Sequence, residues 1–471
     1  MTILSKQIVR GLPSTAFILS GLWAGAVSLA GEFSDMAATF GTTLTLSGTH
    51  QDVTTNPDGT SIDFWVPSYE GAPATAVSLS NPHIASADVY GNVYIADKYS
   101  HAILRITPDG LIHTFAGTHQ PGFNGDGPAS ATTLQLSKPN GLFVLADGTV
   151  YLLDPGNQRI RRVDRNGTMT TVVVDADPRW MPSGRALWVS PDESLIYYTH
   201  EYTPVPPLLI SDGAVVKKWT RAGGIELVCD KTVGFRNPGN IAVNPVDGKL
   251  YVTDRAEEDA SRLATGLFRI DGVNQRTRMT GNVTQPQASD KQVALNSFIE
   301  GTRGIAFRAD GSYFLCGHKD GDVWFVDTSG VIHRYLRGSG KKDNYMILNG
   351  QHPPLQDMDY FAQPRAVTLA PNGDLLVVSN DSGFVFKVNR ADPQPAPIGF
   401  HLSGIDGGGA HLSWEGVFGY GYRLESSPSL SPPAWVPVGA VSAPPQQTHL
   451  NFNDPSPGST TTKFYRLLPS L

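Results

Sequence analysis

The residues best suited to chemistry occupy one recurring position in a series of sequence repeats. Each repeat contains an apolar run, and the position just before that run is polar in all copies but one. The occupants are His83, Asn140, Arg185, Gly239, Arg303 and Arg365. Arginine binds carboxylate, sulfate or phosphate through a planar bidentate fork, which suits a small anion or an acidic sugar. The alternative is that these arginines satisfy backbone carbonyls and water.

The repeats that would position these side chains are clearest in residues 79–118 and 136–174. Each copy holds four β-rich runs separated by Gly, Asp-Gly or Asn-Gly turns, which predicts a four-stranded antiparallel meander. One such sheet cannot bury both of its faces, so repeated sheets stack radially as a β-propeller. The recurring position then faces the central channel, because it precedes the innermost strand of each blade.

Six blades are predicted within residues 31–390 of an all-β protein. The later copies diverge, and the sixth stops after three strands. Residues 43–48 resemble an isolated fourth strand that precedes the first full repeat. Pairing of this strand with the last repeat would join the two ends and remove unpaired sheet edges. A proline-rich linker at 391–397 follows, and alternating apolar residues within 398–471 predict a small β-sandwich domain.

Composition and charge limit the possible partners. The 471 residues include 40% apolar residues, 49 Gly and 35 Pro, which fits a turn-rich β protein with a core. A formal net charge of −7 excludes nucleic acid or an anionic membrane as the main partner. Cys229 and Cys316 form neither a disulfide framework nor a metal-binding spacing, and we interpret them as buried apolar residues, with a single disulfide left open.

The first 30 residues have the pattern of a signal peptide. Lys6 and Arg10 give a positive start, an apolar segment covers 16–30, and Ser28-Leu29-Ala30 resembles a cleavage site. An uncleaved membrane anchor is disfavoured by the short segment and its glycines. We therefore expect a secreted, periplasmic or cell-surface protein with no membrane span after removal of the signal.

A family resemblance supports the propeller prediction. Residues from about 40 to 390 resemble a six-bladed NHL-repeat propeller, of the superfamily that includes gluconolactonase and regucalcin-like enzymes. The resemblance is carried by Gly-Asn-Val-Tyr-Ile-Ala-Asp at 91–97, Gly-Phe-Asn-Gly-Asp-Gly-Pro at 122–128, and residues 157–160. Such propellers include lactonases, lyases and binding scaffolds, so the resemblance implies the fold and leaves the function to the site.

The lactonase-like enzymes of this superfamily hold a divalent metal with Glu, Asn and Asp residues from different blades. Asn140 matches the Asn motif, and Glu300 resembles the Glu motif although Thr302 replaces an expected proline. The Asp position has no counterpart, because Pro238 is followed by Gly239. The resemblance thus implies Asn140 and Glu300 as candidate ligands of Ca²⁺ or Zn²⁺.

Two further metal hypotheses are weaker. An amidating lyase needs several channel histidines for zinc, but His83 alone occupies the recurring position. His200 aligns with three aspartates at the ends of second strands, Asp97, Asp154 and Asp254, which we interpret as caps of tight turns. The segment 122–127 has the oxygen atoms of a Ca²⁺ loop but lacks the later bidentate Glu of an EF-hand, which favours a structural turn.

The sequence therefore predicts recognition of a small anionic or carbohydrate ligand at the channel mouth, with no catalytic residue assigned. One alternative is a metal-dependent gluconolactonase-like hydrolase. Another is a scaffold that binds a protein partner through its blade surfaces or its C-terminal domain, for which the arginines would be irrelevant.

Overall fold

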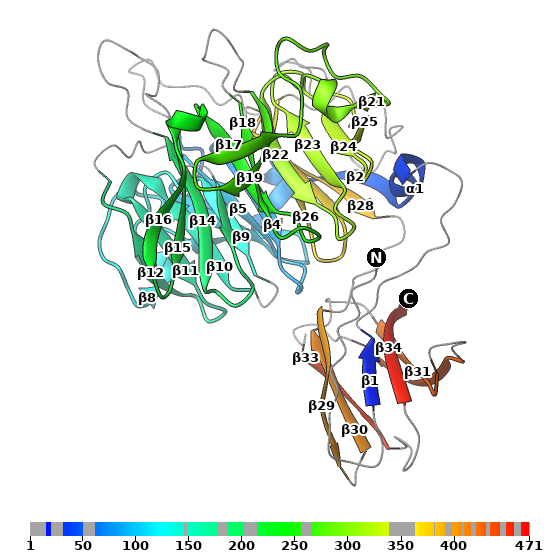
Figure 1. Ribbon diagram of the computed structural model, residues 1–471. Helices are drawn as coiled ribbons and strands as arrows, with labels where there is room; N and C mark the ends of the chain where they lie inside the picture. Colours follow the sequence, from blue (N-terminus) through cyan, green and yellow to red (C-terminus); the bar gives the residue numbers. More distant parts are fainter. Residues whose placement is uncertain are drawn as a thin grey trace, which may run out of the picture.

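The computed structural model describes residues 16–19, 32–49, 62–145, 148–177, 186–201, 214–255, 265–338, 363–380, 382–390, 398–406, 409–415, 421–429, 434–442, 449–455 and 463–470. Between residues 40 and 390 they form six antiparallel sheets, which we number as blades I to VI (Figure 1). Blades I and V carry a short fifth strand, as does blade II, and the other three have four strands. The predicted β-propeller is confirmed.

The strands of the first three blades follow one another along the chain. Blade I contains β3 (Ala72–Pro73), β4 (Pro82–Ala87), β5 (Val93–Asp97), β6 (Ala102–Ile106) and β7 (Leu111–Ala116). Blade II contains β8 (Ala129–Ser130), β9 (Gly141–Val144), β10 (Val150–Asp154), β11 (Arg159–Val163) and β12 (Thr168–Val174). Blade III contains β13 (Leu187–Val189), β14 (Leu195–Glu201), β15 (Ala214–Thr220) and β16 (Gly224–Cys229).

The remaining blades bring the chain back to its start. Blade IV contains β17 (Pro238–Val243), β18 (Leu250–Asp254), β19 (Gly266–Gly272) and β20 (Gln275–Arg278). Blade V contains β21 (Gln292–Val293), β22 (Thr302–Phe307), β23 (Tyr313–Gly317), β24 (Val323–Val326) and β25 (Val331–Leu336). Blade VI contains β26 (Pro364–Leu369), β27 (Leu375–Ser379), β28 (Phe384–Arg390) and β2 (Phe40–Ser47), which pairs antiparallel with β28.

The core of the propeller lies between neighbouring blades. The second strands β5, β10, β18, β23 and β27 are buried along their whole length, so their two faces pack against the blades on either side. One cluster joins Tyr94 of blade I to Leu142 of blade II, and another joins Phe314 of blade V to Phe384 of blade VI. Helix α1 (Glu32–Ala38) adds Phe33 and Met36 to the second cluster. Stacked sheets thus bury the apolar faces that a single sheet would expose.

The C-terminal residues form two further sheets that enclose one core, the predicted β-sandwich (Figure 1). One sheet contains β29 (Ile398–Asp406), β30 (Gly409–Glu415) and β33 (His449–Asp454). The other contains β31 (Gly421–Ser427), β32 (Val436–Ser442), β34 (Lys463–Ser470) and β1 (Ala16–Leu19). The core includes Trp414, Tyr422 and Tyr465.

Strand β1 belongs to the segment predicted as a signal peptide, and it pairs parallel with β34. The rest of residues 1–31 lies outside the described part of the chain, as does the linker at 391–397. Within the described residues, no helix has the length and apolar character needed to cross a membrane.

The two cysteines are buried and free. Cys229 packs in a cluster of blades III and IV, whereas Cys316 packs in the cluster of blades V and VI. They therefore act as small apolar residues, and the disulfide that the sequence left open is not formed.

Candidate functional site

The recurring polar position coincides with a bulge in the innermost strand of several blades. Strand β4 pairs with β5 at Pro82 and again at Ile84, and His83 between them faces no residue of β5. The same one-residue irregularity occurs at Arg303 in β22 and at Arg365 in β26. A bulge takes the extra residue out of the strand ladder and changes the direction of its side chain. In blades I, V and VI the bulge thus turns one side chain out of the regular sheet.

Blade IV has the same kind of irregularity, and it explains the single glycine in the series. The register shifts between the paired Pro238 and Ile241. A Cβ atom on Gly239 would lie 2.5 Å from Oγ1 of Thr253 and 2.7 Å from the carbonyl oxygen of Arg303 in the next blade. Only glycine allows this close approach, so the side chain that blade IV offers comes from the next residue, Asn240.

A residue with a left-handed conformation directly precedes the innermost strand in blades I, V and VI, and in blade II it lies three residues before β9. The φ angles are 76° at Asn81, 57° at Lys138, 68° at Gly301 and 56° at Gln363. This conformation turns the chain sharply and is uncommon outside glycine and asparagine. At His83 the turn is further fixed, because Nδ1 donates a hydrogen bond to the carbonyl oxygen of Asn81 over 2.9 Å.

These bulges and turns bring four of the five predicted ligand-binding residues around one cavity. We call it the mouth cavity, and it is lined by His83, Asn140, Gly239, Asn240, Arg303 and Arg365. The fifth, Arg185, lies outside the described residues. The mouth cavity has a volume of about 10 Å³, which is about the space of one water molecule. A sugar ring does not fit into it, whereas a single ion or one oxygen atom of a larger ligand does.

The amide of Asn140 points to a role for this cavity. Asn140 is 2% exposed, and neither its Oδ1 nor its Nδ2 has a hydrogen-bond partner within the described part of the chain. A buried amide without partners costs free energy, and such groups are uncommon in folded proteins. Its position on the mouth cavity places the unsatisfied amide where a ligand or an ordered water would complete it.

The charges around the mouth cavity are positive. His318 follows β23 and is buried beside it, with Nδ1 donating to the carbonyl oxygen of Gln363 over 3.1 Å. Burial lowers the pKa of His318 well below its ordinary value, and Arg303, Arg365 and Arg255 lower that pKa further. The three arginines thus add a positive potential at His318 to the larger effect of burial.

The mouth cavity contains one of the two predicted metal ligands. Asn140 lines the mouth cavity, but Glu300 is not among its lining residues. Within the described part of the chain, no group of three His, Cys, Asp or Glu side chains is placed to hold a metal. Arginines at the cavity repel a divalent cation. The lining of the mouth cavity therefore does not fit the metal centre that the resemblance implied.

The three aligned aspartates cap turns, as the sequence indicated. Asp97 accepts a hydrogen bond from the backbone N–H of Ser80 at 2.8 Å, and Asp154 accepts one from Ser137 at 2.7 Å. Asp254 accepts two, from Arg236 and Asn237, each at 2.9 Å. Each carboxylate thus holds the loop that leads into its own innermost strand and positions the start of that strand.

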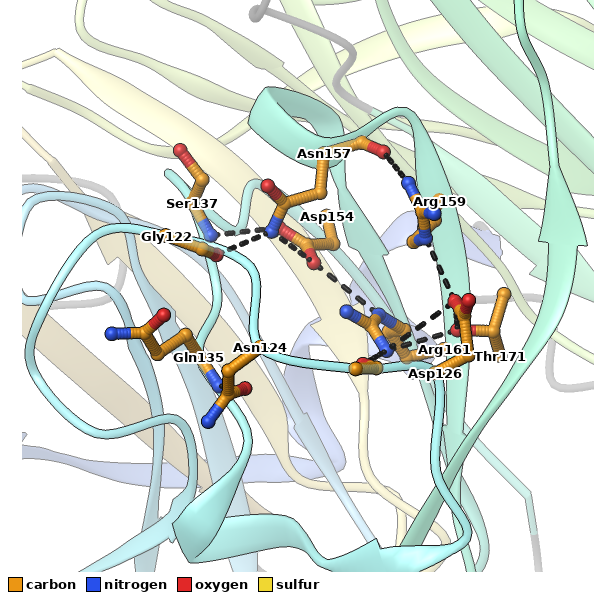
Figure 2. A network of polar contacts seen from close by, with 11 residues as sticks. Gly122, Asn124, Asp126, Gln135, Ser137, Asp154, Asn157, Arg159, Arg161 and Thr171 are labelled. Atoms are coloured by element: carbon orange, nitrogen blue, oxygen red, sulfur yellow. Dashed lines mark hydrogen bonds and ion pairs between the residues drawn. The ribbon is translucent and has the colours of Figure 1, made fainter.

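The segment 122–127 is a structural turn whose side-chain oxygen atoms accept hydrogen bonds from other groups of the protein (Figure 2). Asn124 donates to the carbonyl oxygen of Thr133 at 2.9 Å and accepts from the N–H of Gln135 at 2.7 Å. Oδ1 of Asp126 accepts from Nε of Arg159 at 2.8 Å. These contacts tie the loop to its own blade, which leaves the Ca²⁺ hypothesis without support.

Sequence reasoning missed three residues, namely Asn240 on the mouth cavity and the interacting pair Arg255 and His318. Asn240 was hidden because the repeat alignment placed Gly239 at the recurring position. Arg255 and His318 each follow the last residue of a second strand, Asp254 and Gly317, so a second recurring position just after the second strands would have indicated them. The residue types after the second strands were visible in the sequence, but their role depends on which loops come together in the folded protein.

The comparisons with known proteins agree on the fold. No protein-family model matches the chain. A stretch of 77 residues, 16% of this chain, is 36% identical to Protein SUPPRESSOR OF QUENCHING 1, chloroplastic, of Arabidopsis thaliana, and covers 7% of that protein. A structure of unknown function from Bacteroides thetaiotaomicron is 13% identical and covers 73% of this chain and 74% of its own, with a TM-score of 0.51.

An auxiliary nutrient-binding protein from the same organism is 12% identical, with a TM-score of 0.50 over 74% of this chain and 76% of its own. The chain is a β-propeller protein of this structural type. A gluconolactonase from Xanthomonas campestris is 13% identical and covers 76% of this chain and 92% of its own, but its TM-score of 0.47 supports no argument about activity. The β-propeller that the sequence indicated is thus confirmed as a fold.

Proposed function

We propose that this protein is a six-bladed propeller that binds a small anionic ligand, or the acidic group of a carbohydrate, at the mouth cavity. The observation that supports this most directly is the set of side chains on that cavity. Two arginines, a histidine and two asparagines line it, and the buried Asn140 amide has no other partner in the described residues. Hydrogen-bond donors in a positive, desolvated site favour an anion.

The size of the mouth cavity limits how the ligand binds. Its volume of about 10 Å³ admits one oxygen atom, so a larger ligand inserts only its charged end. A carboxylate fits this requirement because it is planar and matches the fork of an arginine. An acidic sugar would place its carboxylate in the cavity and its ring outside.

The test is a thermal-shift and calorimetric titration of the mature protein with acetate, sulfate and glucuronate, in Arg365→Gln beside the parent chain. A ligand that binds the folded state raises the melting temperature by mass action. Loss of a charged hydrogen bond weakens binding by about tenfold or more. The matched control is Arg308→Gln, whose arginine forms a surface ion pair with Asp310 at 3.2 Å, away from the mouth cavity.

Equal weakening in both variants, or no shift with any anion, would contradict the proposal. The second outcome would favour the alternative of a scaffold that binds a protein partner through its blade surfaces or its C-terminal domain. A shift with Ca²⁺ or Zn²⁺ that a chelator reverses would favour the gluconolactonase-like hydrolase instead.

We also propose that the chain is exported, on the basis of its positive, then apolar, N-terminal sequence. Expression of the full chain in a bacterial host with cell fractionation tests this. An intact mass that matches removal of residues 1–30 in the exported fraction supports export, and full-length protein in the cytosol contradicts it.

A further inference from the structure

Beyond the mouth cavity, the central channel forms a second and larger space that the proposed function leaves unused. We call it the channel cavity, and its volume is about 440 Å³. The innermost strand of every blade contributes to its wall, for example through Ile84, Leu142, Trp188, Ile241, Ile305 and Val367. Pockets for small molecules have volumes of about 300–1,000 Å³ and mostly apolar walls. The channel cavity has both properties.

The wall of the channel cavity is apolar and in part exposed to solvent. The rings of Phe143, Trp188 and Phe307 line it and are only partly buried. One of its few polar groups, the hydroxyl of Thr368, already donates to the carbonyl oxygen of Ala85 at 2.7 Å. An apolar body that fills this space removes both its own surface and these rings from water, which is favourable.

The two cavities are adjacent. Asn240 lines both of them. In blade V, Arg303 lines the mouth cavity and Ile305 lines the channel cavity, and two residues of extended strand span about 6.6–6.8 Å. Cationic and apolar binding surfaces therefore follow one another along the channel within the length of a small molecule.

We propose that the channel binds an amphiphilic carboxylate, with its head at the mouth cavity and its apolar body in the channel cavity. This inference rests on the proposed function, because it keeps the anion site and adds the chemistry of the rest of the ligand. The positive head site disfavours an amine, and the apolar wall disfavours a sugar body, since buried hydroxyl groups would lack partners there. The head is a carboxylate because this is the smallest of the common anionic groups and can place a single oxygen atom in the mouth cavity.

The test is a series of straight-chain carboxylates, from acetate through butyrate and hexanoate to octanoate, titrated calorimetrically below their micellar concentrations. Each buried methylene contributes about 0.8 kcal/mol, which corresponds to about a fourfold gain in affinity per methylene. We expect this gain, a stoichiometry of one per chain, and weaker binding of octanol than of octanoate.

Two variants locate the apolar body. Ser86→Leu places a larger side chain on the wall of the channel cavity, so the gain from acetate to octanoate should fall at least tenfold while acetate binds as before. The matched control is Ser130→Leu on the exposed strand β8. If Ser86→Leu does not fold, Ala242→Leu on the wall in blade IV serves the same purpose.

A spectroscopic measurement adds a direct signal for the channel. Bromine quenches nearby tryptophan, so 8-bromooctanoate should quench the fluorescence of the parent chain, and Trp188→Phe should lose most of that quenching. Affinity that does not change from acetate to octanoate, or quenching that Trp188→Phe leaves intact, would overturn the inference and leave the anion site standing. Failure of every carboxylate, acetate included, would overturn the anion site as well.

Discussion

Blades I and II come from the two most similar repeats, but the contacts of the buried aspartate at the end of the second strand differ between them. In both blades the aspartate ends the second strand and accepts a backbone N–H from the preceding loop. In blade II, Nε of Arg161 lies 3.3 Å from Oδ2 of Asp154, and both side chains are fully buried (Figure 2). In blade I the residue aligned with Arg161 is Leu104.

The difference appears in the protonation of the two aspartates. Burial raises the pKa of Asp97 to about 7, and Oδ1 of Asp97 has no hydrogen-bond partner in the described residues. Burial also raises the pKa of Asp154, but only to about 6, because Asn157, the N–H of Ser137 and Arg161 stabilise its charge. Burial thus raises the pKa of the carboxyl at this position in both blades, and in blade II the contacts of Asn157 and Arg161 oppose the increase.

In both blades a threonine of the outermost strand donates its hydroxyl to an acidic side chain, but the acid differs between the blades. Thr171 in blade II donates its hydroxyl to Asp126 at 2.7 Å. The aligned Thr114 in blade I donates its hydroxyl to Glu70 at 2.9 Å. Compared with Asp126, Glu70 lies one position later in the aligned repeat and has one more methylene group. The hydrogen bond to the outermost strand is the same in both blades.

The largest expected effect follows from removal of the aspartate in blade II. Asp154→Ala leaves the buried Arg161 without this carboxylate, and breaking a buried ion pair costs about 3–5 kcal/mol. Asp97→Ala removes no ionic partner and should cost about 1–3 kcal/mol. Denaturant unfolding measures the loss of unfolding free energy in each variant. Equal losses would show that the contact of Asp154 with Arg161 does not contribute to stability.

The second prediction gives blade II the third-strand residue of blade I. Arg161→Leu removes the cation that lowers the pKa of Asp154, so the folded-state pKa should rise above about 6. The ionised carboxylate is then buried without that cation, and we expect a loss of roughly 2 kcal/mol at pH 8 that becomes smaller at pH 5, where the acid is protonated. A loss that does not depend on pH would assign the role of Arg161 to packing.

The third prediction concerns the pH dependence of blade I. The pKa of Asp97 is about 7 when folded and about 3.9 when unfolded, so its stabilising contribution is complete below about pH 4 and is lost as pH rises through 7. Asp97→Asn keeps an oxygen for the N–H of Ser80 and does not titrate. The free energy of unfolding of this variant, relative to the parent, should therefore increase from pH 4 to pH 8.

The difference in the free energy of unfolding between Asp97→Asn and the parent chain should change by at most about 1.4 kcal/mol per pH unit between the unfolded and folded pKa values of Asp97. Unfolding in urea at pH 4, 6 and 8 measures it. A constant difference across this range would show that Asp97 is already ionised at pH 4 in the folded protein.

The smallest effect concerns the loop that blade II adds to the common pattern. Asn124→Ala removes the two hydrogen bonds that hold segment 122–127 and should cost about 1–2 kcal/mol. Asn166→Ala, at an exposed turn of the same blade, is the matched control and should change stability by less than about 0.5 kcal/mol. A Ca²⁺-dependent melting shift that Asn124→Ala abolishes would reopen the metal hypothesis for this loop.

Much of this protein could be predicted from its sequence. Turn residues and apolar runs at a repeated spacing defined the strands, because strand alternation and tight turns are local properties. The recurring position identified His83, Asn140, Arg303 and Arg365 from their spacing alone, and all four line one cavity. The turn-capping role of Asp97, Asp154 and Asp254 was likewise apparent, because Asp at the end of a strand favours such turns.

Other features depended on contacts between blades. The backbone of Arg303 approaches Gly239 from the next blade, so blade IV supplies Asn240 instead. The charges of Arg255, Arg303 and Arg365 act on His318 because loops distant in sequence converge near it. The apolar channel cavity exists because six innermost strands from separate repeats face one another. Sequence spacing determines the geometry within a blade, whereas bulges and packing between blades determine what the channel presents, since those distances are set by residues far apart in the chain.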